Sequence, residues 1–188
     1  MRAFIAIQLD PAITAEIERL QQRLRARIPD VVRWTRPKNI HLTLKYLGEI
    51  EDTRVGMFEA AIKRACQSTP PLRLCVENIG CFPSIAKPNI IWLGVHGESE
   101  LLSVLQTRIE FETKALCDIA EDRAFQPHLT LARVRNGKYR QARGIAACLH
   151  PFQPAALGQW TARHVDLMRS DLRDQGPMYT SVAGIPLI

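Results

Sequence analysis

His41-Leu42-Thr43-Leu44 occurs a second time in this chain, as His128-Leu129-Thr130-Leu131. The 188 residues include five histidines, so a four-residue repeat that starts at two of them is rarely a coincidence. Each copy has the period of a β-strand, because His and Thr share one face and the two leucines share the other. We therefore expect the leucine faces to pack on a core and the His/Thr faces to line a cleft.

The repeat would bring two imidazoles and two hydroxyls to one place. An imidazole exchanges a proton near neutral pH, and a hydroxyl can donate to an oxygen of an anion. Two copies thus supply an acid and a base for one substrate. With one ring protonated and the other neutral, we expect kcat/KM to have a bell-shaped pH dependence near neutrality. The pKa values of the two histidines would start from ~6.5 and shift in opposite senses. His96, His150 and His164 lack such neighbours, and we interpret them as structural.

Paired histidines serve several kinds of site. A metal site would need a further Cys, Asp or Glu ligand at short spacing, and neither motif offers one, so no metal is predicted. The sequence has no G-x-S-x-G turn for a serine nucleophile. One other use is metal-free phosphoryl transfer, in which a base and an acid act on opposite sides of phosphorus. Thr43 and Thr130 would then donate to the non-bridging oxygens and stabilise their charge.

Composition and charge limit the class of protein. Hydrophobic residues make up 46% of the chain and charged residues 23%, which is ordinary for a soluble globular protein. The length suits one domain of two lobes, residues 1–188. No apolar run approaches the ~18 residues of a membrane span, so no membrane partner is expected. The net charge of +6 favours an anionic partner, with nucleic acid one candidate, and no obligate protein partner is inferred.

Cysteine usage and the first residues indicate the compartment. The chain has five cysteines, an odd number, and no C-x-x-C pair. Residues 1–9 are too short for a signal peptide and have the pattern of a strand. We therefore expect free thiols and a cytoplasmic location.

Hydrophobic periodicity and turn residues place the elements around the two motif copies. Helices are expected at 11–28, with Asp10 as N-cap, at 53–67, with Asp52 as N-cap, at 98–117 and at 138–149. Strands are expected at 2–9, 31–35, 40–47, 72–82, 89–95, 128–134, 160–169 and 178–185. Residues 150–159 would form a loop and 174–177 a turn.

The spacing of the motif copies predicts the architecture. Their offset, 128 − 41 = 87 residues, is nearly half of the chain, and each motif strand follows a helix and a proline-containing connector. An α+β fold of two similar lobes satisfies this pattern. Its helices would lie outside, and its motif strands would face each other across a cleft.

The repeated H-x-T-x resembles the signature of the 2H phosphoesterases, and the likeness covers essentially the whole chain. The likeness is to the bacterial RNA 2′,3′-cyclic phosphodiesterase branch of that family. It is found in Met1–Ile7, Trp34 with Asn39–Gly48, Trp92–Val95, Pro127–Arg133, and Ser170 with Gly176–Tyr179. The resemblance implies a bilobed fold of two antiparallel sheets with outer helices, pseudo-twofold symmetry around a central cleft, and neither metal nor cofactor.

The resemblance also implies an activity. The branch, historically named 2′-5′ RNA ligase, hydrolyses a terminal 2′,3′-cyclic phosphate on RNA to a 2′-phosphomonoester, with reversible 2′-5′ RNA ligation beside it. By that resemblance His41 is the proton donor to the leaving oxygen and His128 is the proton acceptor that activates water. The partner would be RNA or an oligonucleotide with a 2′,3′-cyclic phosphate end.

Five further side chains are candidates for the substrate site. The resemblance implies that Arg133 contacts the phosphate, although strict alternation from His128 puts it on the leucine face. To reach the cleft, the strand must bend or bulge after Leu131, or the guanidinium must reach around its end. Lys45 has the same parity as His41 and could add positive charge. Base stacking is a role open to three aromatic residues, Phe4, Trp34 and Tyr179.

Two alternatives to an RNA cyclic phosphodiesterase stay open. One is a phosphodiesterase of another small cyclic or nucleotide-linked phosphate, which the length of the substrate would distinguish. The other is a non-catalytic RNA-end-binding protein. The intact histidines argue against the second, because lysine or arginine would bind phosphate while staying charged at all relevant pH values.

Overall fold

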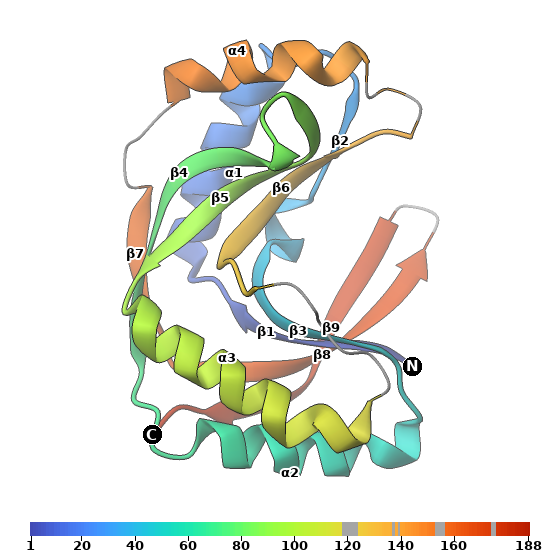
Figure 1. The fold of residues 1–188 in the computed structure, drawn as a ribbon, viewed down its shortest axis with the longest axis vertical. Coiled ribbons are helices and arrows are strands. Elements are labelled where there is room, and N and C mark those ends of the chain that lie inside the picture. The colour runs from blue at the N-terminus through green and yellow to red at the C-terminus, as the bar shows by residue number, and fades with distance from the viewer. Residues whose placement is uncertain (118–123, 137, 139, 153–156, 174–175) are drawn as a thin grey trace.

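The computed structural model describes residues 1–117, 124–136, 138, 140–152, 157–173 and 176–188 (Figure 1). Its strands are β1 Arg2–Gln8, β2 Val32–Trp34, β3 His41–Glu49, β4 Leu72–Ser84, β5 Lys87–Gly97, β6 His128–Val134, β7 Gly158–Ala162, β8 His164–Arg173 and β9 Gly176–Pro186. Its α-helices are α1 Pro11–Arg25, α2 Val55–Cys66, α3 Ser99–Thr113 and the short α4 Ile145–Leu149. The α+β class predicted from the sequence is confirmed.

All of these strands belong to one curled antiparallel sheet, which corrects the prediction of two sheets. The order is β7-β4-β5-β6-β3-β1-β8-β9, and β2 pairs with β6. The two motif strands, β3 and β6, are neighbours in the middle, with three further strands beyond each of them in that order. They join through one residue pair, Leu42 with Leu129. The sheet therefore comprises two halves connected at the motif itself.

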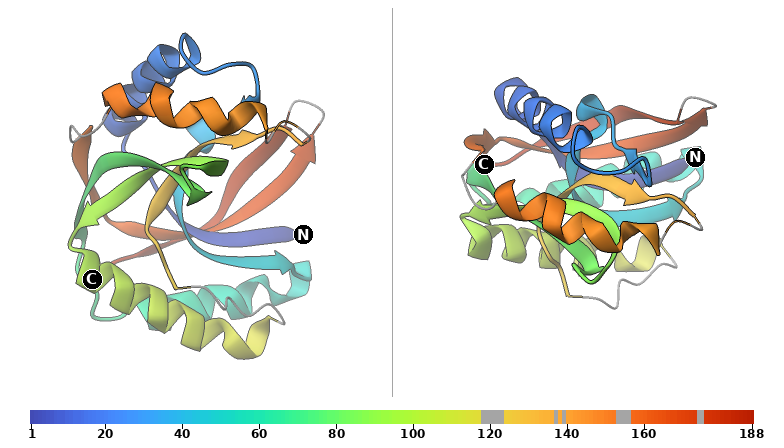
Figure 2. Two further views of the ribbon diagram at one scale, coloured as in Figure 1. Left: turned by 45° about the horizontal axis from the view of Figure 1, so that its top comes forward. Right: turned by 90° about the horizontal axis from the view of Figure 1, so that it is seen from above.

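The helices cover the outside of the curled sheet. Figures 1 and 2 show α1 and α4 at one end of the molecule and α2 and α3 at the other. Asp10 caps α1 as predicted, since its carboxylate accepts a hydrogen bond of 2.8 Å from the Ala12 amide. The predicted cap at Asp52 is wrong. Asp52 instead begins a 3-10 turn ahead of α2 and lies 3.4 Å from the N-terminal amino group.

Both motif strands contain a β-bulge at the same place in the motif. Along β1 the partners of Ile5 and Ala6 are Lys45 and Thr43, so Leu44 is an extra residue. Along β5 the partners of Ile91 and Trp92 are Ala132 and Thr130, so Leu131 is extra. An extra residue reverses the alternation of faces beyond it. Positions 45 and 132 therefore turn toward the core, and positions 46 and 133 turn toward the other face.

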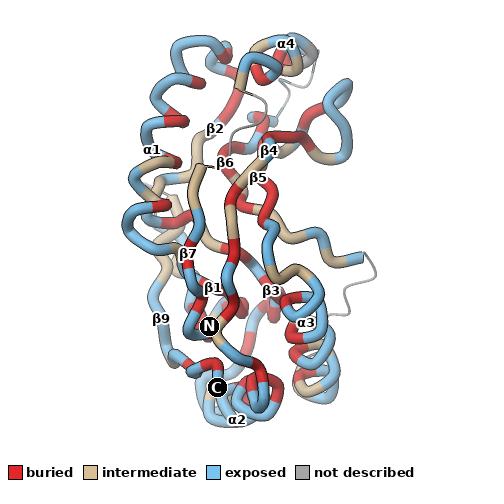
Figure 3. Tube along the Cα trace, turned by 90° about the vertical axis from the view of Figure 1, so that its left-hand side faces the viewer, coloured by how far each residue is buried: buried red, intermediate tan, exposed pale blue. Residues whose placement is uncertain are grey.

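The leucines of both motifs are buried, as the period-two pattern predicts. Leu42 and Leu129 are fully enclosed, and the core extends from them to the inner sides of the helices (Figure 3). β1 is buried on both faces, because Phe4 and Ala6 pack against Met168 on the side opposite the main core. In the described residues, no helix is long and apolar enough to cross a membrane.

Some predicted boundaries are wrong near the C-terminal end. The predicted strand 160–169 is two strands, β7 and β8, separated at Arg163. The last two residues of the predicted loop 150–159 are the beginning of β7. Residues 153–156 of that loop lie outside the described residues. Residues 174–175 of the predicted turn also lie outside them.

Candidate active site

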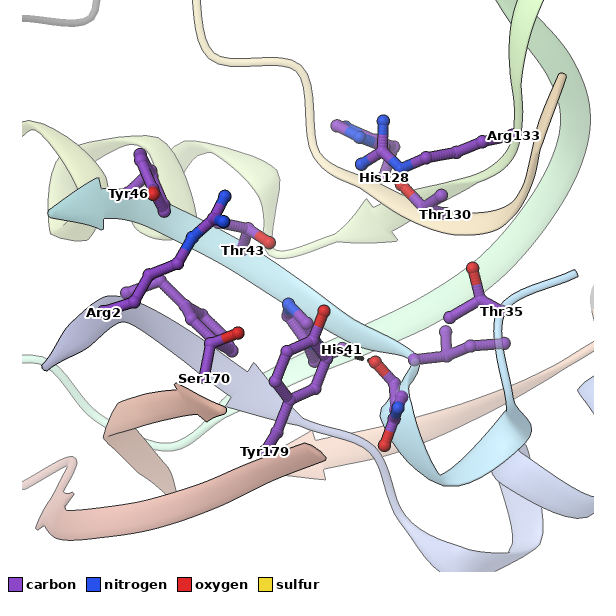
Figure 4. Close-up of a pocket in the computed structure, with 13 residues that line it drawn as sticks. Arg2, Thr35, His41, Thr43, Tyr46, His128, Thr130, Arg133, Ser170 and Tyr179 are labelled. Atoms are coloured by element: carbon purple, nitrogen blue, oxygen red, sulfur yellow. Dashed lines mark hydrogen bonds between the residues drawn. The ribbon is translucent and has the colours of Figure 1, made fainter. Parts of the chain in front are cut away.

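The two motif strands line one pocket of about 320 Å³ at the junction of the two halves of the sheet. In Figure 4 the side chains from β3 and those from β6 lie on different sides of this pocket. The lining residues are Arg2, Phe4, Thr35, Asn39, Ile40, His41, Thr43, Tyr46, His128, Thr130, Arg133, Ser170 and Tyr179. The structure thus brings together both histidines and both threonines of the repeat.

The same hydrogen bond orients each imidazole. His41 Nδ1 lies 2.8 Å from the carbonyl oxygen of Asn39, and His128 Nδ1 lies 2.7 Å from that of Gln126. A carbonyl oxygen only accepts, so both Nδ1 atoms carry a proton and donate it. The Nε2 atom of each ring is left for proton exchange in the pocket.

Burial lowers the pKa of both histidines, contrary to the expectation of opposite shifts. The pKa of His41 falls to about 4, chiefly because burial disfavours the imidazolium, although the bond to the Asn39 carbonyl works against this. Burial also lowers the pKa of His128, and the nearby Arg133 guanidinium lowers it further. Both rings are therefore neutral at pH 7 in the free protein.

Aromatic rings fix the position of His41. Phe4 stacks on the imidazole with ring centroids 4.7 Å apart, and Tyr179 meets it edge-on at 5.2 Å. Phe4 is 5% exposed, so it supports His41 from beneath rather than offering a free face for base stacking. Tyr179 is half-buried, and burial raises the pKa of its hydroxyl, which keeps it a proton donor at neutral pH. On the other side, Phe82 contacts His128 edge-on at 5.0 Å.

Arg133 reaches the pocket because of the bulge at Leu131, one of the two routes that the sequence left open. In β2, Arg33 stands directly opposite Arg133 in the sheet register, and both are exposed. Like charges in that position repel each other and cost stability. An anion bound beside the two guanidinium groups would reduce this repulsion, so the arrangement favours anion binding.

Lys45 and Trp34 lie outside the pocket lining. The bulge at Leu44 turns Lys45 inward, so the parity argument for it is wrong. Its ammonium is buried in an ion pair with Glu110 of α3. Trp34 packs under the Arg25 guanidinium, 5.4 Å from its ring centroid.

The pocket also contains residues that sequence reasoning missed. Arg2 lies over the ring of Tyr46, with its guanidinium carbon 5.3 Å from the centroid. Asn39 is buried, and its side-chain amide donates to the Pro177 carbonyl at 2.8 Å, which ties the connector before His41 to β9. The likeness of Met1–Ile7 and of Asn39–Gly48 to the phosphoesterases was the available signal for both.

The charge of the lining is entirely positive. It contains two arginines and neither aspartate nor glutamate. Among the described residues, no three His, Cys, Asp or Glu side chains are grouped to hold a metal ion. The site thus presents two proton-exchanging rings, hydroxyl donors and guanidinium groups, a set that suits an anionic phosphoester.

Known proteins are similar to this chain in both sequence and fold. The chain is 28% identical over 182 residues to an RNA 2′,3′-cyclic phosphodiesterase of Methanothermobacter thermautotrophicus, covering 97% of this chain and 96% of that protein. It is 24% identical over 183 residues to one of Aquifex aeolicus, covering 97% and 95%. A crystal structure of a Thermus thermophilus protein matches with a TM-score of 0.80 at 24% identity, covering 100% of this chain and 98% of that one.

The family itself is matched over most of the chain. Its description is "LigT like Phosphoesterase", and it matches residues 7–92, which include the first motif, and 95–179, which include the second. Phosphoesterases are hydrolases. The repeated histidine motif, the pocket that it forms and the extent of this match together place the chain in the LigT-like phosphoesterase family.

Proposed function

We propose that the protein is an RNA 2′,3′-cyclic phosphodiesterase that opens a terminal cyclic phosphate and leaves a 2′-phosphomonoester. The observation that carries this proposal is the pair of imidazoles in one positively charged pocket, each with Nδ1 bonded to a backbone carbonyl. The activity for which the relatives are named, RNA 2′,3′-cyclic phosphodiesterase, supports the substrate class.

The reaction needs one proton acceptor and one proton donor. His128 Nε2 takes a proton from water, and the water oxygen forms a bond to phosphorus. The bond from phosphorus to the ribose O3′ breaks in line with that attack, and His41 Nε2 gives O3′ its proton. The 2′-phosphate stays on the ribose. With the 5′-hydroxyl of a second RNA in place of water, the same step forms a 2′-5′ linkage, and its reverse breaks one.

Charge on the phosphate is balanced by the residues around it. Thr43 and Thr130 donate from their hydroxyls to the non-bridging oxygens, and Arg133 supplies a guanidinium. The substrate's negative charge also favours the imidazolium forms. Binding thus raises the pKa of His41 from about 4 and prepares it to act as the acid.

Two other functions make different predictions. A phosphodiesterase for another small phosphate would turn over free cyclic nucleotides or nucleotide-linked phosphoesters as readily as RNA ends. Solved LigT structures from E. coli hold 3′-AMP, ATP, NADP+ or phosphate, at 20–22% identity to this chain. An RNA-end-binding protein would retain a 2′,3′-cyclic end unchanged.

The test is turnover of a defined substrate with the product identified. The dinucleotide ApA with a 2′,3′-cyclic phosphate is incubated with the purified protein, with and without EDTA, and followed by ³¹P NMR. We expect a 2′-phosphomonoester at equal rates in both samples. A 3′-phosphomonoester, an unchanged ring, or activity lost to EDTA and restored by one divalent ion would contradict the proposal.

A further inference from the structure

Arg2 has no role in the proposed reaction, yet its side chain lines the pocket. It is exposed, and within the described ranges its guanidinium contacts the ring of Tyr46, at 5.3 Å from the centroid. The arginines with carboxylate partners, such as Arg169 with Asp171 at 2.9 Å, lie outside the pocket lining. Among the described residues no carboxylate forms an ion pair with Arg2, so its guanidinium can bind an anion in this part of the pocket.

The repeat explains why this arginine comes from β1. Tyr46 in the first motif strand corresponds to Arg133 in the second, because 46 + 87 = 133 and both residues follow an equivalent bulge. The second half of the sheet has Arg133 there, and the first has Tyr46. Arg2 places its guanidinium over this tyrosine from the adjacent strand, so each half contributes one cation to the pocket (Figure 4).

The guanidinium of Arg2 lies over Tyr46, at a different point along β3 from Thr43, which would contact the reacting phosphate. Thr43 and Tyr46 pair with Ala6 and Phe4 across the bulge, and these partners are two residues apart on β1, which is roughly 7 Å along a strand. The reacting phosphate would be held between the histidines by Thr43, Thr130 and Arg133. A guanidinium at Tyr46 is thus placed for a second anionic group further along the substrate.

The polarity of the proposed reaction identifies that group. His41 protonates the leaving ribose oxygen, so the ribose and the chain attached to it lie at the His41 end. Arg2 is at this end, since Phe4, on the same face of β1 and two residues away, stacks on His41 at 4.7 Å. The anion that a ribose carries next along an RNA chain is its 5′-phosphate.

We propose that Arg2 binds the internucleotide phosphate that precedes the terminal cyclic phosphate. The site would in this way select RNA ends over free cyclic mononucleotides. Tyr46 would act as the positioning residue that holds the guanidinium by a cation–π contact. This inference rests on the proposed cyclic phosphodiesterase activity.

The test compares two substrates in two variants. kcat/KM is measured for adenosine 2′,3′-cyclic phosphate and for ApA with the same cyclic end. In the wild type we expect the dinucleotide to be favoured about tenfold, the usual weight of one charge-assisted contact. Arg2→Gln should remove this preference while changing mononucleotide turnover less than about twofold. Arg163→Gln, an exposed arginine outside the pocket lining, controls for loss of one charge.

A neutral linkage tests the contact itself. ApA with a methylphosphonate between its nucleosides lacks the charge that Arg2 would bind. The wild type should treat this substrate like the mononucleotide, and Arg2→Gln should not distinguish it from normal ApA.

The outcomes separate the two proposals. If Arg2→Gln slows both substrates equally, or if the wild type has no preference for ApA, Arg2 does not bind that phosphate, while the phosphodiesterase activity stands. If the wild type turns over neither cyclic phosphate, both proposals fail.

Discussion

At the scale of single residues, the site depends on two backbone carbonyls. Asn39 and Gln126 each accept the Nδ1 proton of the histidine two residues later. Because the bond fixes the tautomer, Nε2 of each ring is the atom that can exchange a proton with substrate. Burial then keeps both rings neutral until an anion arrives.

Loss of either ring should remove acid–base help. We expect His41→Ala and His128→Ala each to lower kcat on a 2′,3′-cyclic phosphate by at least ~10²-fold. His164→Ala, an exposed histidine in β8, should leave kcat unchanged. The account would be wrong if either motif variant kept a rate near that of the wild type.

The sequence identified the repeated residues but not their neighbours. Repetition singled out the histidines and threonines, since four residues recurred together. Apart from the likeness to the phosphoesterases, nothing in the sequence distinguished Arg2 or Asn39. Each contributes through a tertiary contact, Arg2 with Tyr46 of the neighbouring strand and Asn39 with Pro177 of β9. Contacts of this kind depend on tertiary structure and have no local pattern.

At the scale of elements, the paired bulges decide which side chains enter the pocket. Period-two counting from His41 and His128 holds as far as Leu44 and Leu131 and fails beyond them. It therefore misplaced Lys45, and the entry of Arg133 had to be left open. A bulge is set by how two strands pair, so the sequence of one strand does not reveal it.

Lys45 accordingly has a structural role. The Lys45 side chain is 3% exposed and its ammonium is paired with Glu110, so Lys45→Met leaves a carboxylate without its partner in a mostly buried position. We expect a loss of about 3 kcal/mol in the free energy of unfolding, measured in urea, with kcat unchanged. Adding Glu110→Gln should recover most of that loss. A large fall in kcat without a change in stability would instead indicate a substrate contact.

At the scale of the whole molecule, the site lies where two halves of one sheet meet. A single residue pair, Leu42 with Leu129, connects β3 and β6. The 87-residue offset predicted two similar halves, and element boundaries were mostly right. That they form one continuous sheet could not be predicted, because it depends on that one pair of residues far apart in the chain.

Burying two histidines makes stability depend on pH. Their folded pKa values lie below the ordinary 6.5, that of His41 at about 4, so in this range the unfolded chain binds protons that the folded chain does not. Stability is therefore fully present above pH 6.5 and declines as pH falls toward 4. We expect the melting temperature to fall less over this range in His41→Gln/His128→Gln than in wild type. Phosphate should reduce the wild-type loss, because an anion favours imidazolium. Equal declines in both proteins, with and without phosphate, would contradict this.

The most direct test of the two-histidine mechanism is the pH dependence of kcat/KM on a 2′,3′-cyclic phosphate. This quantity reports the free enzyme, in which His41 must be protonated while His128 is neutral. Because burial lowers both pKa values, we predict a bell with its maximum between pH 4 and 6.5 rather than at neutrality. The maximum of kcat should lie at higher pH, since bound substrate raises both values. A flat kcat/KM profile between about pH 4 and 8 would show that the two imidazoles do not exchange protons during turnover.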